Sequence, residues 1–226
     1  MKKQLLILVS ALNLVVLPTM ADTFNDATGD FTGGNSSLDI TSVSVVNDAT
    51  TLTFTINLAA DPAANSWHNY YVGIVKPSAS GGGVFNATGG WGKDIQMSSG
   101  GMDYVLASWN PPGSGASILA WDGASTWTSV NGSAGVGASS VTIPVALSAL
   151  GLSIGDTIGF DVWTTDSGGD TVLDALSDST SRSWNSNPFD TGANALPFTL
   201  VPEPGVCALL GLGALALIRR AVRRLP

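Results

Sequence analysis

Hydrophobic and polar residues alternate along most of the central part of the chain. The clearest stretch is residues 51–58, TLTFTINL, in which Leu52, Phe54, Ile56 and Leu58 alternate with threonines and an asparagine. A period of two places these four apolar side chains on one face, as in a strand with one buried side. This stretch therefore predicts a half-buried β-strand.

The preceding stretch, residues 37–46, alternates as well but changes phase partway along. Leu38 and Ile40 share one face, and from Ser42 onward the apolar positions shift to Val43 and Val45. A β-bulge or a bend at this point accounts for the shift. The turn-forming sequence NDATT joins the two stretches, which together predict a first β-hairpin.

Further short stretches with strand-like patterns follow, separated by clusters of Gly, Ser, Asn, Asp and Pro. They cover residues 69–77, 93–98, 103–110, 117–123, 125–130, 140–147, 156–165 and 196–200. One brief helical pattern, ALSALGLSIG, ends at glycines. About ten short strands with turn-rich connections predict an all-β fold, an antiparallel, jelly-roll-like β-sandwich. We place this single domain at residues 22–200.

The N-terminus predicts a secretory signal peptide at residues 1–21. Lys2 and Lys3 precede an apolar run, and PTMA follows it, with Thr19 and Ala21 at the −3 and −1 positions of a cleavage site. The alternative is an uncleaved anchor helix, which Asn13 and the proline of PTMA make short.

The C-terminal segment, residues 201–226, combines three features in order. Pro202, Glu203 and Pro204 come first, the fourteen uncharged residues 205–218 follow, and four arginines end the segment: Arg219, Arg220, Arg223 and Arg224. As a helix the apolar run would be about 21 Å long, against roughly 30 Å for a bilayer core. We expect a short transmembrane helix with its arginines on the cytoplasmic side.

The region between the two ends is strongly acidic. It contains sixteen Asp, no Glu, two Lys and one Arg, a formal charge of −13. Such a charge excludes nucleic acid as a partner, because phosphates require a basic surface. The one cysteine, Cys207, lies in the C-terminal apolar run, so the domain has no disulfide and depends on its core or on bound metal.

No catalytic motif stands out in this sequence. His68 is the only histidine, which excludes zinc sites built from several histidines. A Ser–His–Asp triad that uses His68 stays open, although no G-x-S-x-G motif accompanies it. No pair of aspartates is singled out for glycoside hydrolysis. We therefore expect a protein that is not an enzyme.

Two groups of aspartates are candidates for metal binding. Asp26, Asp30 and Asp39 surround the entry to the first hairpin, and a second group follows the strand predicted at residues 156–165. The second group consists of Asp166, Asp170 and Asp174. Calcium prefers carboxylate and carbonyl oxygens, so it is the expected ion. The alternative is that these are ordinary turn aspartates.

Tryptophan is abundant, with seven residues in the chain. Four lie next to predicted turns, where an exposed indole can stack on a sugar ring. These candidates for carbohydrate contact are Trp91, Trp121, Trp127 and Trp184. The alternative for each is packing, or stabilisation of a hairpin by a cross-strand pair.

The C-terminal features resemble a PEP-CTERM sorting signal, on the residues Pro202-Glu203-Pro204, the short apolar span and the arginine cluster. The resemblance implies a Gram-negative bacterium that makes exopolysaccharide. It also implies an exosortase-type membrane peptidase as partner, which cleaves near the tripeptide. The protein would then be anchored transiently in the inner membrane before it reaches the cell surface or the extracellular matrix.

The domain itself resembles the DOMON-like or family-9 carbohydrate-binding-module sandwich. The resemblance rests on DATGD…SLDITSVSVVNDATTLTFTINL, YYVGIV, LAWDGASTWT, VTIPVALSALGLSIGDTIGFDVWTTD and LPFTL. It implies sugar or cofactor binding and, as in some members of the family, calcium near the N-terminal aspartates Asp26, Asp30 and Asp39.

Together these observations predict an exported surface or matrix protein with a non-catalytic sandwich that binds exopolysaccharide and calcium. Two alternatives remain open at this point. One is a purely structural matrix protein with no defined ligand, and the other is a secreted enzyme that acts on glycans.

Overall fold

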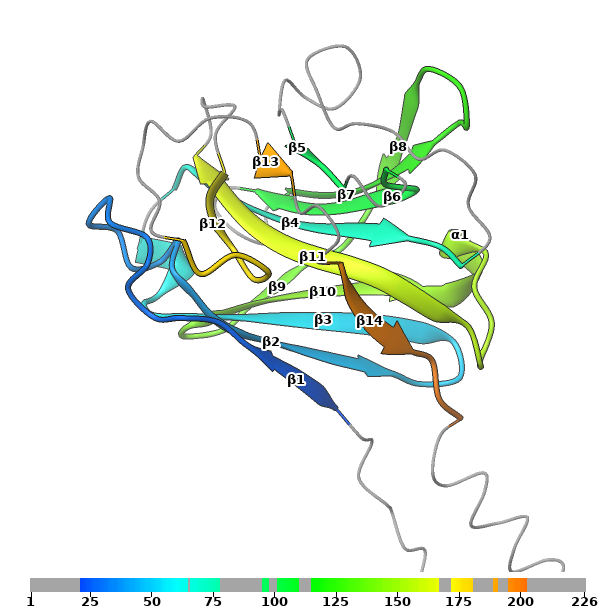
Figure 1. The fold of residues 1–226 in the computed structure, drawn as a ribbon, viewed down its shortest axis with the longest axis horizontal. Coiled ribbons are helices and arrows are strands. Elements are labelled where there is room, and N and C mark those ends of the chain that lie inside the picture. Colours follow the sequence, from blue (N-terminus) through cyan, green and yellow to red (C-terminus); the bar gives the residue numbers. More distant parts are fainter. Residues whose placement is uncertain are drawn as a thin grey trace, which may run out of the picture. The chain divides into compact units, whose positions relative to one another are not determined.

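The computed structural model describes residues 21–64, 66–77, 95–97, 101–109, 115–166, 172–180, 189–190 and 195–202. Within these ranges the chain forms mainly β-strands, which lie in two antiparallel sheets facing each other (Figure 1). The predicted all-β sandwich is confirmed at this level. The brief helical pattern forms α1, Leu147–Leu150, which ends at Gly151.

The first sheet has five strands in the order β1-β2-β3-β10-β9. Their bounds are Asp22–Asn25 for β1, Ile40–Asn47 for β2, Thr51–Leu58 for β3, Ser140–Ala146 for β10 and Gly135–Val136 for β9. In β3 buried and half-buried positions alternate without interruption, as the period of two predicts. The register of β2 against β3 shifts between Ile40 and Ser42, which confirms the predicted bulge.

The second sheet follows the order β12-β11-β4-β6-β7-β8, with β14 paired to the first half of β11. The bounds are His68–Val75 for β4, Tyr104–Trp109 for β6, Gly115–Trp121 for β7, Trp127–Asn131 for β8, Thr157–Asp166 for β11, Val172–Ala175 for β12 and Leu196–Thr199 for β14. Two short strands, β5 (Ile95–Gln96) and β13 (Phe189–Asp190), pair in parallel, which the antiparallel expectation did not include.

The main core lies between the two sheets. The rings of Phe54 from the first sheet and Phe160 from the second meet with centroids 5.4 Å apart, and Phe24 packs edge-on against Phe160 at 5.0 Å. Each large apolar side chain buried here contributes about 1.5–3 kcal/mol. The hydrophobic alternation of the sequence is therefore the main source of the fold's stability.

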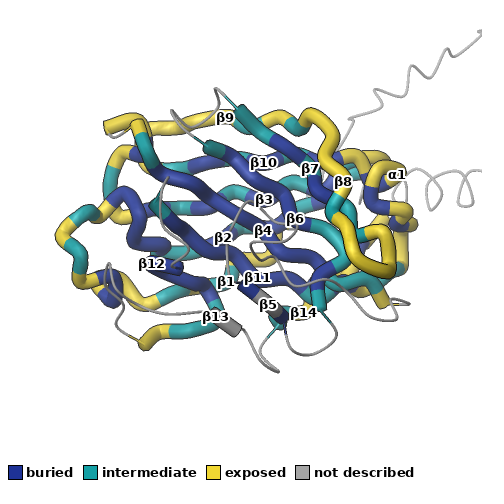
Figure 2. The backbone as a smooth tube through the Cα atoms, turned by 90° about the horizontal axis from the view of Figure 1, so that it is seen from above, coloured by how far each residue is buried: buried dark blue, intermediate teal, exposed yellow. Residues whose placement is uncertain are grey.

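The outer face of the second sheet is covered too. Tyr71 and Trp163 stack there with ring centroids 6.1 Å apart, beside the buried Met97 and Met102. A Cβ on Gly73 would lie 2.6 Å from both Met102 and Trp163, so only glycine fits at this position. As a result, seven of the eight residues of β4 are buried, and the centre of the molecule is dark in Figure 2.

The predicted membrane segments lie outside the described residues. The signal peptide up to residue 20 and the tail from residue 203 onward, including the span 205–218, belong to that part. In the residues that are described, no helix has the length and apolar character needed to cross a membrane.

Candidate metal centre

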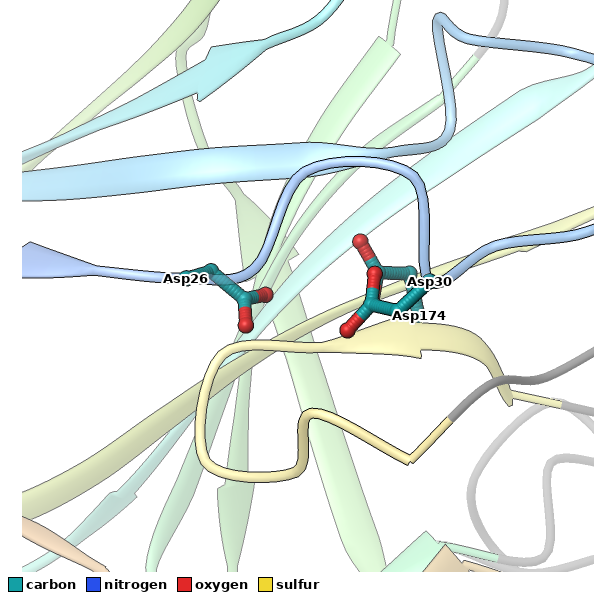
Figure 3. A group of neighbouring side chains, drawn as sticks. All are labelled: Asp26, Asp30 and Asp174. Carbon is teal, nitrogen blue, oxygen red and sulfur yellow. The ribbon is translucent and has the colours of Figure 1, made fainter.

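The two predicted groups of aspartates contribute to a single cluster. Asp26 and Asp30 follow β1, and Asp174 lies on β12 at the edge of the other sheet. One carboxylate oxygen from each of the three lies within 4.8 Å of the others (Figure 3). We refer to Asp26, Asp30 and Asp174 as the carboxylate cluster.

Hydrogen bonds with backbone groups position Asp26 and Asp174 in the cluster. The Asp26 amide donates to the Thr41 carbonyl at 3.1 Å, which continues the pairing of β1 with β2. Asp174 accepts from the Ile40 amide at 2.5 Å and from the Ala175 amide at 2.8 Å. One carboxylate thus joins the start of β2 to β12, that is, the first sheet to the second.

A tight turn brings Asp30 back toward Asp26. Gly29 has φ of +88°, a conformation that side chains with a Cβ rarely adopt. Its amide donates to both carboxylate oxygens of Asp39, at 3.1 and 2.9 Å. Asp39 therefore holds the turn, whereas Asp30 faces the cluster.

Three oxygens of the cluster are buried without a hydrogen-bond partner among the described residues. They are Oδ2 of Asp26 and both carboxylate oxygens of Asp30. Asp30 is only 7% exposed. Burying a charged oxygen without a partner is costly, and proteins normally pair it or place it on a metal. These unpaired oxygens are what a bound cation would satisfy.

The electrostatics of the cluster agree with its burial. Loss of solvent raises the pKa of Asp26 to about 7, and the charge of Asp30 adds to the rise. Burial, with the charges of Asp26 and Asp30, raises the pKa of Asp174 to about 8. Burial and the charge of Asp39 raise the pKa of Asp30 as well. The backbone N–H groups of Asp30 and Phe31 are near enough to offset part of the increase, but neither has the geometry of a hydrogen bond to this carboxylate.

No lysine or arginine of the described ranges neutralises this cluster. Lys76 is the only such residue in those ranges, and its ammonium group lies over the ring of Tyr104, 5.2 Å from the centroid. Considering the described residues alone, the carboxylates carry protons, repel one another or share a cation. Lys93 and Arg182 lie outside these residues.

A further buried aspartate, Asp161, was missed by the sequence analysis. It lies on β11, is fully buried, and accepts hydrogen bonds from the Ser177 hydroxyl at 2.6 Å and the Val162 amide at 2.8 Å. Burial raises its pKa to about 7. Because its hydrogen bonds are made, we assign it to the support of the loop after β12 rather than to the cluster.

Of the other predicted ligands, Asp39 and Asp166 are not among the three converging carboxylates. Asp39 is buried in the turn described above and its pKa is also raised by burial. Asp166 ends β11 opposite His68, away from the three converging carboxylates. Asp170 lies outside the described residues. Among the described residues, one cluster thus takes two aspartates from the first predicted group and one from the second.

Two of the four candidate tryptophans lie in the described part of the chain, and they form a pair. Trp121 and Trp127 face each other across the β7–β8 hairpin, with ring centroids 5.4 Å apart and planes inclined by 55°. Both are half-buried, and Asp122 caps the turn between them by accepting from the amides of Ala124, Ser125 and Thr126. Trp91 and Trp184 lie outside the described residues.

The environment of His68 does not favour a catalytic triad. Its ring nitrogens contact the Asn35 amide at 2.9 Å and the Ser37 hydroxyl at 3.1 Å. His68 is fully buried and Ser37 is 1% exposed, so this serine cannot reach a substrate from solution. Burial lowers the pKa of His68 to about 4, and the ring acts as a neutral link between the loop before β2 and β4.

Comparisons with known proteins found no match. No family model, curated protein or solved structure was matched by this chain. The PEP-CTERM and DOMON-like resemblances therefore remain expectations from the sequence.

Proposed function

We propose that this chain is an exported, non-catalytic β-sandwich protein that binds calcium at the carboxylate cluster and contacts extracellular polysaccharide. The observation that carries the proposal is the convergence of Asp26, Asp30 and Asp174 with three buried oxygens unpaired in the described part of the chain. Each aspartate comes from a segment that the fold itself positions: Asp26 and Asp30 follow β1, and Asp174 lies on β12.

Calcium fits the donor set better than a transition metal does. All three groups are carboxylates, which are hard oxygen ligands, and calcium accepts six to eight oxygens including carbonyls and water. When bound, calcium would supply two positive charges to a site that otherwise holds only acidic groups. In a domain without disulfides, such an ion would hold β1 and its loop against β12.

The polysaccharide contact rests on the Trp121–Trp127 pair. Indole rings at the end of an exposed hairpin offer apolar faces to the C–H side of a sugar ring. The domain's net negative charge favours neutral sugars, or acidic sugars bridged by calcium, over other anions. A purely structural protein is the alternative, and the half-burial of both rings as a cross-strand pair is what favours it.

A glycan panel tests the polysaccharide contact directly. The full chain in detergent is expected to bind a polysaccharide with calcium present, and Trp121→Ala or Trp127→Ala should weaken binding about three- to tenfold. Thr128→Ala, an exposed change on the same hairpin, is the matched control and should bind normally. Absence of binding to any glycan, including exopolysaccharide of the producing cell, would favour the structural alternative.

The proposed route to the cell surface uses the C-terminal signal, with an exosortase-type membrane peptidase as partner. Its support is the order of Pro202-Glu203-Pro204, apolar span and arginines in the sequence. Replacing Glu203 by alanine should leave the full-length protein in the membrane fraction, as followed by immunoblot of cell fractions. Leu210→Ile, which keeps the apolar span intact, should be released normally. Normal release of the Glu203 variant would refute the sorting role.

An enzyme that acts on glycans receives little support from the site. Two carboxyl groups that cleave a glycosidic bond flank the substrate at about 5–9.5 Å. Here one oxygen from each aspartate lies within 4.8 Å of the others, and Asp30 and Asp174 are buried. A sugar ring has no place between them.

A further inference from the structure

The C-terminal end of the folded domain is held by one side chain. The Asn47 amide nitrogen donates to the Val201 carbonyl at 2.8 Å, and its amide oxygen accepts from the Val201 amide at 3.0 Å. A third hydrogen bond, to the Asp48 carbonyl at 3.0 Å, fixes the orientation of this side chain, and Asn47 is only 5% exposed. The asparagine thus pairs with Val201 as a neighbouring strand would.

The residues before Val201 belong to the core. Phe198 and Leu200 are 3% and 1% exposed and pack between the sheets. The Leu200 amide donates to the Asp156 carbonyl at 2.9 Å, and the Gly155 amide donates to the Leu200 carbonyl at 2.8 Å. A cut within β14 would remove a strand and open the core.

The residue after Val201 cannot continue this pairing. Pro202 has no N–H to donate, and a proline also restricts the residue before it to extended conformations. Pro202 is exposed. Among the described residues, Val201 is therefore the last one whose backbone is hydrogen-bonded to the domain.

A peptidase must also polarise the carbonyl of the bond that it cuts, by placing that oxygen among hydrogen-bond donors of its own. The Val201 carbonyl oxygen is already bonded to Asn47. The bond between Val201 and Pro202 is therefore protected while Asn47 stays in place. The first bond on the far side of this protected stretch joins Pro202 to Glu203.

We propose that Asn47 is a positioning residue that ends the folded domain at Val201, so that removal of the tail cuts at or beyond the Pro202–Glu203 bond. This inference rests on the proposed processing of the tail and adds where the cut falls. The step is hydrolysis: water adds its hydroxyl to the carbonyl carbon of the cut bond and a proton to the amine of the departing tail.

Both processed ends would lie at the same end of β2. Asp22, the first residue after the predicted signal cleavage, pairs with Val45, two residues before the asparagine that holds Val201. Figure 1 shows the start of β1 and the end of β14 leaving the sandwich on the same side. Both membrane-bound ends would thus be cut at one pole of the domain.

Limited proteolysis of the full chain in detergent tests the boundary. With proteinase K and intact-mass analysis, the protected core of the wild type should end at Pro202 or later. Asn47→Ala should lose residues 200–202 about tenfold faster, because two hydrogen bonds to Val201 are gone. Asn47→Asp, which keeps the acceptor but not the donor, should be intermediate. Asn57→Ala removes an asparagine bond to Ser42 in the same sheet and should leave the boundary unchanged.

The outcomes separate this inference from the sorting proposal. A wild-type core that ends at Val201 or earlier, or an Asn47→Ala boundary equal to that of the wild type, would overturn the inference even if the variant is less stable. In producing cells, the released protein should carry Pro202 or a later residue at its C-terminus. A protein that is never released, with the protease boundary intact, would refute the sorting role and leave the boundary standing.

Discussion

Replacing Asp30 by asparagine should stabilise the metal-free protein and remove its response to calcium. Asparagine has nearly the same shape but no charge, so the variant loses the repulsion that Asp30 exerts on Asp26 and Asp174 in the absence of metal. In the wild type, calcium at about a hundred times its Kd would add about 2.7 kcal/mol. For a domain of this size, that corresponds to a rise in Tm of about 5–11 °C.

The measurement is thermal unfolding of both proteins by circular dichroism, in chelator and in calcium. The Asp30→Asn variant should have the higher Tm in chelator, and the wild type should have the higher Tm in calcium. Replacing an aspartate that has only a structural role would not produce this reversal. Asp48→Asn is the matched control, because Asp48 accepts from the amides of Thr50 and Thr51 in an exposed turn. It should lower the two Tm values equally. An Asp30 variant that keeps the calcium response would contradict the proposed site.

The metal-free protein should become less stable as the pH rises from about 4 to 8. Asp26, Asp161 and Asp174 have folded-state pKa values of about 7, 7 and 8, all above the value near 3.8 expected when unfolded. Their contribution to stability is therefore fully present below pH 3.8 and is lost as the pH rises through the folded-state values. For a single group, a difference of one unit between its folded-state and unfolded-state pKa changes the free energy of unfolding by about 1.4 kcal/mol. We therefore expect Tm to fall by at least about 3–6 °C.

The protonation of His68 changes the stability in the opposite direction over the lower part of this pH range. Its pKa falls from 6.5 to about 4 on folding, so its contribution is present above pH 6.5 and is lost as the pH falls toward 4. The window from pH 6.5 to 8 therefore isolates the contribution of Asp26, Asp161 and Asp174 from that of His68.

Calcium should reverse the trend in this window, since it binds the ionised carboxylates. The difference between calcium-bound and metal-free Tm should grow with pH. The measurement is a series of melts at closely spaced pH values, with and without chelator. A metal-free Tm that is constant or rises between pH 6.5 and 8 would show that the cluster does not hold these protons.

Much of the sandwich could be predicted because its strands bury one face each. The alternation of Leu52, Phe54, Ile56 and Leu58 follows directly from the pleat of β3, and the phase change at Ser42 follows from the bulge beside it. Such patterns are local, so they can be seen without knowing which strands are neighbours.

The metal centre was predictable only in its parts. Asp26 and Asp174 are far apart in the chain, and they meet because β1 pairs with β2 while β12 pairs with β11. Both strands are four residues long and carry no clear alternation, so the sequence predicted neither of them. Asp161 was missed for a related reason: it lies in a strand buried on both faces, where a carboxylate is not expected.

Because β4 is buried on both faces, hydrogen exchange of its amides can report the stability of the whole domain. The strand is paired with β11 on one side and β6 on the other, and its side chains are covered above and below. Amide hydrogens in such a position exchange with solvent only when the whole domain opens. The exchange rates of Tyr70, Val72 and Ile74 therefore report the free energy of global unfolding under native conditions. The amides of β1, at an exposed edge, report local opening. Calcium that binds the folded domain should slow exchange in β1 and, because it raises the free energy of global unfolding, in β4 as well.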